Sequence, residues 1–273
     1  KLLENLTTAE GVGSIFQFLY IDADTHIAEN LKLPKQWQQN IGFYALPYIQ
    51  EACQHDMNLK KWFDYEIVRH APFAPAQFDL TRSTTLYRQR IALYHDLITG
   101  HFSKVRASIH RSLLSMQQQP PDLPLVVICT SLIGGTGGAI ALDVAYLVQH
   151  ILEALNSDAH VLGVFALSNI FTSALSHLQE TRHIRSISNQ VAAIKEIQHY
   201  ARSRYEFGPQ GHVVSFNNLE PFESYWLFGC DRSGRLEGKL PTDYFSMIAA
   251  ELSDAVITGG WVMRLKRLEY GNA

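Results

Sequence analysis

The sequence predicts an α/β fold with three layers, in which a Rossmann-like parallel sheet lies between helices. Two apolar runs, Leu125 to Thr130 and His160 to Leu167, have the composition of strands buried on both faces, as in a parallel sheet. Each run is followed by a segment whose apolar residues recur at helical spacing, residues 139–155 and 184–197. Strands that alternate with helices in this way indicate βαβ units.

The second helical segment has a regular apolar pattern. We expect one face of it to turn inward, formed by Ile184, Ile187, Val191, Ile194 and Ile197. An earlier segment, from Phe102 to Met116, shows the same three- and four-residue steps and predicts another amphipathic helix.

The composition bounds the size of the protein and the classes to which it can belong. The 273 residues, 47% of them hydrophobic, are enough for one sizeable core, so we expect residues 1–273 to form one domain. The net charge of −3 gives no overall field that favours nucleic acid or an anionic membrane. No apolar run is long enough to span a bilayer. The three cysteines are widely spaced and odd in number, which indicates reduced thiols and a cytoplasmic protein, with Cys129 inside a buried strand.

Common catalytic motifs are missing from the sequence. The 12 histidines lack metal-ligand spacing, and neither H-E-x-x-H nor C-x-x-C occurs, so we expect no metal site built by protein side chains alone. A G-x-S-x-G elbow is also absent. These patterns argue against a zinc enzyme and a serine hydrolase.

A glycine-rich segment, Gly134-Gly135-Thr136-Gly137-Gly138, stands between the first strand and the first helix. A loop in this position lies at the positive end of a helix dipole, where backbone N–H groups have no partner within the helix. Glycines let the main chain approach an anion closely. The arrangement predicts a phosphate-binding loop.

The order of residues in this loop excludes one common motif and weakens another. A Walker loop requires a Lys-Ser or Lys-Thr pair, which the loop lacks. The dinucleotide fingerprint G-x-G-x-x-G begins at Gly135, but Ile140 stands at its last glycine. The next strand ends in Leu167-Ser168-Asn169, without the acidic residue that binds a ribose.

The loop resembles the phosphate loop of the tubulin/FtsZ superfamily, a G-G-G-T-G-S/T-G run between a buried strand and a helix, and the chain is most similar to the bacterial tubulin-like branch. Gly134 to Gly137 match this run, whereas Ile133, Gly138 and Ala139 depart from it. The resemblance implies a GTPase-domain fold that binds GTP or GDP with Mg²⁺. Carried over to this chain, the phosphate contacts are Gly134, Gly135, Thr136, Gly137, Gly138, Arg82 and Arg90. The contacts to the ribose, the base or the Mg²⁺ region are Asp24, Glu180, Arg182 or Arg185, and Asn189.

Several of these residues have an ordinary structural alternative. Asp24 follows a predicted strand, Ile15 to Ile21, and can equally cap the next helix. Arg82 and Arg90 can lie on the solvated face of an amphipathic helix. Glu180 can be an acid that stabilises a helix start.

The resemblance also implies head-to-tail self-association into filaments, or assembly into a larger complex, with GTP hydrolysis completed by a neighbouring subunit. The acidic N-x-D-x-x-D motif that would serve this step is absent, so no catalytic residue is assigned and the isolated chain is expected to bind nucleotide only. The first strand of the family, with its own glycine loop, is expected upstream of Lys1 or missing. The C-terminal activation domain is expected to be missing or truncated.

Two other functions remain open at this point. An NAD(P)-dependent oxidoreductase would use the incomplete G-x-G pattern. A tubulin-like scaffold that no longer binds nucleotide would explain the departures at Ile133, Gly138 and Ala139.

Overall fold

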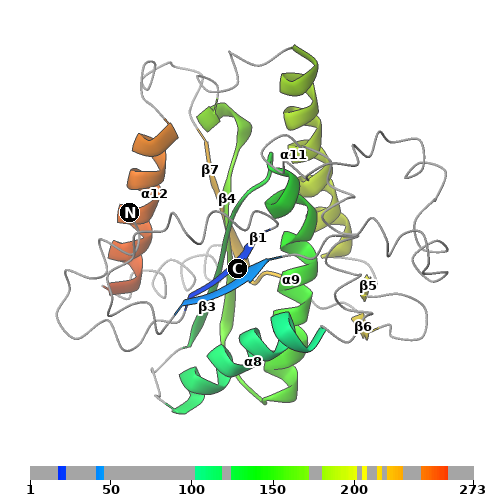
Figure 1. The fold of residues 1–273 in the computed structure, drawn as a ribbon, viewed down its shortest axis with the longest axis vertical. Coiled ribbons are helices and arrows are strands. Elements are labelled where there is room, and N and C mark those ends of the chain that lie inside the picture. Colours follow the sequence, from blue (N-terminus) through cyan, green and yellow to red (C-terminus); the bar gives the residue numbers. More distant parts are fainter. Residues whose placement is uncertain are drawn as a thin grey trace, which may run out of the picture.

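The structure is a computed structural model that describes residues 18–22, 41–45, 102–118, 124–171, 180–201, 205–207, 214–216, 220–229 and 241–257. Figure 1 shows the elements in these ranges. The strands are β1 (Phe18–Asp22), β2 (Ile41–Ala45), β3 (Leu125–Ser131), β4 (His160–Ala166), β5 (Tyr205–Phe207), β6 (Val214–Phe216) and β7 (Ser224–Phe228). The helices are α8 (Phe102–Gln118), α9 (Gly135–Ala154), α11 (Glu180–Tyr200) and α12 (Pro241–Ile257), with a short 3-10 helix η2 (Ser168–Phe171).

The central sheet has the order β3-β4-β7 and is parallel throughout. Its register pairs Leu125 with His160 and Ser131 with Ala166, so β3 and β4 end side by side. Strands β1 and β2 form a separate parallel pair, and β5 and β6 a short antiparallel pair. The parallel sheet confirms the predicted fold class, because parallel neighbours require a crossover connection, which α9 supplies between β3 and β4.

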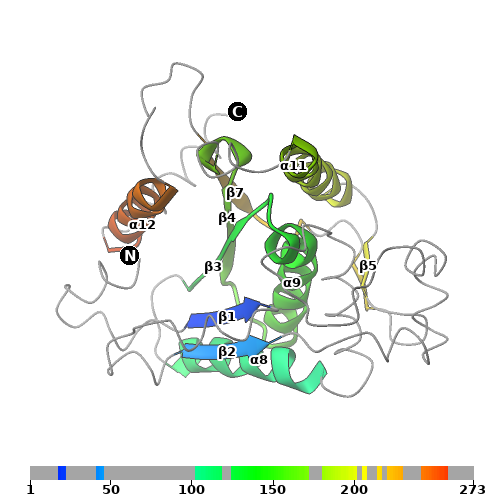
Figure 2. The same cartoon turned by 45° about the horizontal axis from the view of Figure 1, so that its top comes forward.

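Helices cover both faces of this sheet, as Figures 1 and 2 show: α12 lies on one side, and α9 with α11 on the other. The larger core lies on the α9 side and includes Tyr146, Leu147, Ile151 and Phe165, all fully buried. On the other side, Leu252 of α12 belongs to a smaller cluster with β4 residues. The predicted three-layer arrangement is therefore confirmed.

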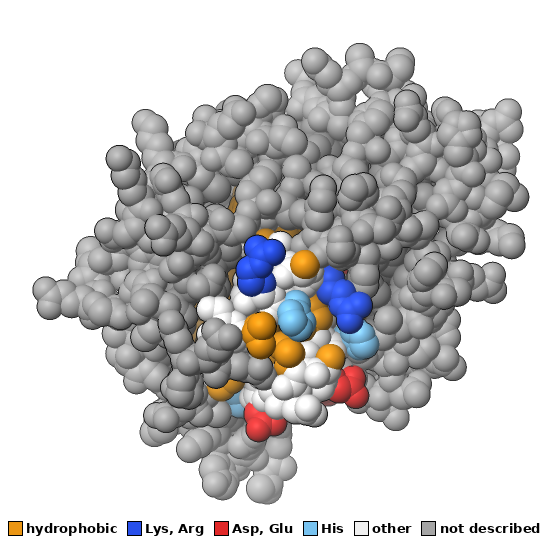
Figure 3. Space-filling view, turned by 60° about the horizontal axis from the view of Figure 1, so that its bottom comes forward, with side chains coloured by type: hydrophobic (Ala, Val, Ile, Leu, Met, Phe, Trp, Pro, Cys, Tyr) orange, Lys and Arg blue, Asp and Glu red, His pale blue; other side chains and the backbone are white. Residues whose placement is uncertain are grey.

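The helix α8 is amphipathic, as its spacing predicts. Ile109 and Leu113 belong to the main core, whereas Arg106, His110 and Arg111 are exposed. Figure 3 looks onto the molecule from below the view of Figure 1, where α8 lies, and shows Lys, Arg and His side chains among apolar ones. Among the helices described, none has the length and hydropathy needed to cross a membrane.

The buried face of α11 differs from the predicted one. Asn189, Ala193 and Ile197 are buried, and they lie at four-residue steps. Three apolar residues expected to face inward are exposed instead: Ile184 (55%), Ile187 (40%) and Val191 (45%). The prediction is right for Ile197, which is buried, and for Ile194, which packs against the main core. It was wrong for the other three residues, because packing against α9 selects a face with smaller side chains earlier in the helix.

The strand β3 is less covered than predicted. Its residues are mostly half-buried and Cys129 is exposed, whereas β4 is buried from Val161 to Ala166. Among the described strands β3 pairs only with β4, which leaves it at the edge of its sheet. Although Cys129 is exposed as a residue, desolvation by the surrounding protein raises the pKa of its thiol to about 12.

Candidate functional site

The glycine loop forms the start of α9, as the sequence predicts. Gly134 is the N-cap residue, with an extended backbone at φ −72° and ψ 152°, and no side chain of the described residues caps the helix. The first hydrogen bond within the helix runs from Gly138 N–H to Gly134 O, at 3.3 Å. The N–H groups from Gly134 to Gly137 therefore have no acceptor within α9, and they stand at the positive end of a 20-residue helix.

The loop lies at the carboxyl edge of the central sheet. Leu132 N–H donates to Ala166 O at 3.1 Å, which joins the end of β3 to the end of β4. Leu167 N–H donates to Phe228 O at 2.9 Å and joins β4 to β7. The three strand ends are thus linked, and this edge is where open parallel sheets bind their ligands.

Gly137 is a glycine for reasons of packing. A Cβ built on it would lie 1.6 Å from Thr130 Oγ1 and 3.0 Å from Ser131 O. A Cβ on Gly134 would meet only Ser131 O, at 3.7 Å, an ordinary van der Waals contact. The first turn of α9 is therefore pressed against the end of β3 at Gly137, while Gly134 has room for a side chain.

The residue that ends β3 carries an unsatisfied polar atom. Ser131 Oγ is buried and has no hydrogen-bond partner in the described part of the protein. Buried polar atoms are nearly always paired, so this hydroxyl is an exception. Alternation along β3 directs it to the face opposite Thr130, the residue that contacts Gly137.

Two neighbouring amides of α11 reach the loops at this edge. Asn189 is 8% exposed, and its Nδ2 donates to Ile133 O at 3.4 Å. Gln190 Oε1 accepts a hydrogen bond from Ser168 N–H at 2.5 Å. One helix thus holds both the glycine loop and the segment that follows β4.

The predicted site residues divide into three groups. Gly134 to Gly138 lie together at the start of α9, and Asn189 contacts the residue just before them. Glu180 is the first residue of α11 and Arg182 and Arg185 follow in its first turns, but their side chains are not described. The last group lies outside the described residues: Asp24, Arg82 and Arg90.

Sequence reasoning missed Gln190 and Ser168. The sequence indicated them only weakly, as polar residues beside apolar ones. Gln190 follows Asn189 in a helix whose other inward residues are mostly apolar, and Ser168 comes directly after an apolar strand. Polar residues in both places indicate a hydrogen bond only once the strand and the helix are known to be neighbours.

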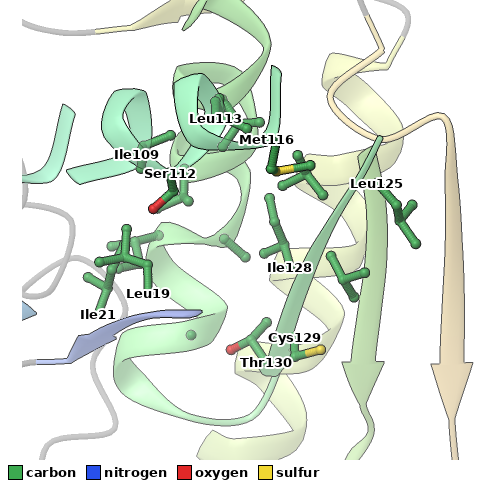
Figure 4. A pocket seen from close by; sticks show the side chains of 17 residues that line it. Leu19, Ile21, Ile109, Ser112, Leu113, Met116, Leu125, Ile128, Cys129 and Thr130 are labelled. Carbon is green, nitrogen blue, oxygen red and sulfur yellow. The ribbon is translucent and has the colours of Figure 1, made fainter. Parts of the chain in front are cut away.

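A separate cavity of about 230 Å³ lies on the side of β3 away from β4. Figure 4 shows side chains from β1, α8 and β3 around it, including Leu19, Ile109 and Ile128. Its walls are largely apolar, and Thr130 and Gly137 are among the residues that line it. An apolar cavity does not suit a charged phosphate, so the loop edge is the better candidate for an anion site.

The donors at this edge suit a phosphate, because backbone amides at a helix start donate hydrogen bonds to anionic oxygens. The described residues contain no group of three His, Cys, Asp or Glu side chains that could hold a metal ion. The predicted Mg²⁺-associated residue, Asp24, lies outside them.

The parallel sheet with a glycine-rich helix start at its carboxyl edge defines an α/β protein of the kind that binds anionic ligands there. The family model described as tubulin-like matches residues 4–259. The chain therefore belongs to the tubulin-like family, within the tubulin/FtsZ superfamily. Neither a curated protein nor a solved structure matched the chain in the corresponding comparisons.

Proposed function

We propose that this protein binds GTP and GDP, with the phosphates held by the loop from Gly134 to Gly138. The observation that carries the proposal is the row of backbone N–H groups at the start of α9, which have no acceptor within the helix. Membership of the tubulin-like family supports a guanine nucleotide as the source of the phosphates.

The remaining contacts of the proposed site come from other parts of the chain. Arg82 and Arg90 would pair with phosphate oxygens, which a guanidinium does well. Asp24 would lie near Mg²⁺, while Glu180 and Arg185 would bind the ribose side of the nucleotide. Residues 1–273 would then act as one nucleotide-binding domain.

We further propose that copies of the protein associate head to tail, as filaments or within a larger complex. Hydrolysis of GTP would then be completed by a neighbouring subunit, and the isolated chain would bind nucleotide with little turnover. Family membership supports self-association. We also propose that the protein belongs to the bacterial branch of the superfamily and acts in the cytoplasm, as the resemblance of its sequence implies.

Calorimetric titration with GTP, GDP and NADH, each with Mg²⁺, tests the proposal. We expect the wild-type protein to bind both guanine nucleotides and not NADH. The most informative variant is Gly134→Ala, because the protein has room for the added methyl group. Its one close neighbour would be Ser131 O, at an ordinary van der Waals distance of 3.7 Å. This variant should lose at most about 1 kcal/mol of folding free energy, the usual cost of alanine at an N-cap.

Gly134→Ala should weaken GTP binding about tenfold or more, because the methyl group stands where a phosphate must approach the backbone. Unchanged GTP affinity in this stable variant would rule out the loop as the phosphate site. Binding of NADH alone would point instead to an oxidoreductase.

One observation favours a second candidate, a tubulin-like scaffold that binds no nucleotide. Packing against Thr130 is enough to explain Gly137, and Ile133 is buried in place of the family's first glycine. A wild-type protein that binds neither GTP nor GDP at about millimolar concentration would favour this candidate.

A further inference from the structure

The two adjacent amides of α11 divide their contacts between the two loops at the carboxyl edge. Asn189 is buried and donates to Ile133 O, whereas Gln190, one residue on, accepts from Ser168 N–H. Successive residues of a helix point in directions about 100° apart, so one turn of α11 can reach two separate loops. Those two loops are themselves linked by the hydrogen bond from Leu132 N–H to Ala166 O.

The hydrogen bond from Asn189 to Ile133 O sets the direction of the Gly134 N–H in the glycine loop. The Ile133 carbonyl belongs to the same peptide group as the Gly134 N–H, and a peptide group is planar and trans. Fixing the carbonyl oxygen on the α11 side therefore fixes the N–H on the opposite side. A hydrogen bond to the carbonyl also polarises the peptide and strengthens its N–H as a donor.

The contact made by Gln190 fixes the position of the helix that carries Asn189. Ser168 begins η2, directly beyond the end of β4, and Leu167 is tied to β7 through Phe228 O. The hydrogen bond from Ser168 N–H to Gln190 is short, at 2.5 Å. Through it α11 is anchored to the most buried strand of the sheet while Asn189 reaches the loop.

We infer that Asn189 and Gln190 are positioning residues, which hold the Ile133–Gly134 peptide so that its N–H points toward a bound phosphate. The inference rests on the proposed nucleotide site. It gives Asn189 a role that acts through the loop instead of direct contact with the nucleotide. It also makes α11 the element through which a change at β4 would reach the phosphate site.

The test compares Asn189→Leu and Gln190→Met with Tyr146→Phe as the matched control. Leucine has the shape of asparagine but no N–H donor, and methionine has the length of glutamine but no comparable acceptor. Tyr146 OH of α9 donates to Tyr200 O of α11 at 3.0 Å. Tyr146→Phe therefore removes a hydrogen bond of α11 that involves neither the glycine loop nor the segment after β4.

We expect Asn189→Leu to weaken GTP binding about five- to tenfold, and Gln190→Met by a smaller factor. Tyr146→Phe should lower thermal stability to a similar extent and leave GTP affinity unchanged. In the nucleotide-free protein, Asn189→Leu should also speed hydrogen exchange at the Gly138 amide, because that amide bonds to Gly134 O.

Equal GTP affinity in the wild type and Asn189→Leu, together with unchanged exchange at Gly138, would overturn the inference. Equal losses of GTP affinity in Asn189→Leu and Tyr146→Phe would also overturn it, since general loosening of the helix pair would then explain both. Failure of the wild type to bind GTP would instead reject the proposed function. The exchange rate at Gly138 would then decide by itself whether Asn189 holds the loop.

Discussion

The strands β3 and β4 are parallel neighbours of the same length, and both are followed by a helix on the same side of the sheet. The two residues after each strand are tied to the rest of the fold, but the chain then continues differently. After β3, Leu132 N–H bonds to Ala166 O and Ile133 O to Asn189, and the chain then enters a helix start with no side-chain cap. After β4 the backbone is tied at once, by Leu167 to Phe228 O and by Ser168 to Gln190.

This difference indicates that the two strands have different roles, one in stability and one in ligand binding. The strand β4 is buried from Val161 to Ala166 and anchors the fold, whereas β3 lies at the edge among the described strands and is followed by open backbone donors at the start of α9. A ligand site needs backbone groups left unsatisfied by the fold, and such groups are tolerated only where the rest of the structure holds them in place.

The largest effect should come from the anchoring strand. Phe165 of β4 is 0% exposed and packs edge-to-face on Phe222, with ring centroids 5.3 Å apart. Phe165→Ala should cost about 3–5 kcal/mol of unfolding free energy through lost burial and the cavity left behind. At the paired position in β3, Thr130→Ala should cost no more than about 1.5 kcal/mol, because it removes one methyl group and one hydroxyl from a half-buried residue.

Urea unfolding of both variants measures these costs. Similar losses of unfolding free energy in the two variants would show that β3 and β4 contribute equally to stability. That result would contradict the anchoring role given to β4.

A smaller but still large effect is expected at the end of β3. Gly137→Ala places a methyl group 1.6 Å from Thr130 Oγ1, so it should cost about 1–3 kcal/mol as an overpacked position. Adding Thr130→Ala removes the closest atom and should restore part of this stability. Some strain should remain, because Thr130 Cβ and Ser131 O each lie 3.0 Å from the new methyl group.

The two Gly137 variants also separate packing from ligand approach. We expect GTP binding to recover together with stability in the double variant, since the methyl group faces Thr130 and Ser131 at the end of β3. GTP binding that stays weak while stability recovers would mean that Gly137 also serves the approach of the ligand.

The smallest effect is a change in the pH dependence of stability, caused by His150 of α9, a residue remote from both strand ends. Burial, helped by the positive charge of Arg106 and opposed by Glu153, lowers the pKa of His150 below its ordinary value of 6.5. As the pH falls through 6.5, the unfolded chain binds a proton that the folded protein still excludes, so the free energy of unfolding decreases until the pH reaches the lower folded pKa.

His150→Gln should remove this part of the pH dependence and leave stability above the ordinary pKa nearly unchanged. Urea unfolding at about pH 8 and about pH 5.5 measures the difference for both proteins. A steeper loss of stability on acidification in the variant than in the wild type would contradict the lowered pKa.

Particular elements show how far the sequence could predict the structure. The apolar runs that predicted strands correspond to β3 and β4, and the glycine segment between strand and helix lies at the start of α9. The inward face of α11 was wrong at three of its five residues, because exposed Ile184, Ile187 and Val191 match helical spacing as well as the buried residues do. Cys129 was expected inside and is exposed, since an apolar run does not tell an edge strand from a central one.

The sequence by itself determined the local features of this protein: which segments are strands, where a helix begins, and where glycines leave the main chain open to close approach. These depend on neighbours in the chain, through backbone conformation and the spacing of apolar residues. Only the tertiary structure decided that Gly137 is pressed against Thr130 and that Asn189 and Gln190 hold two different loops. The partners in these contacts come from separate elements, and their distances exist only after the sheet and α11 have packed together.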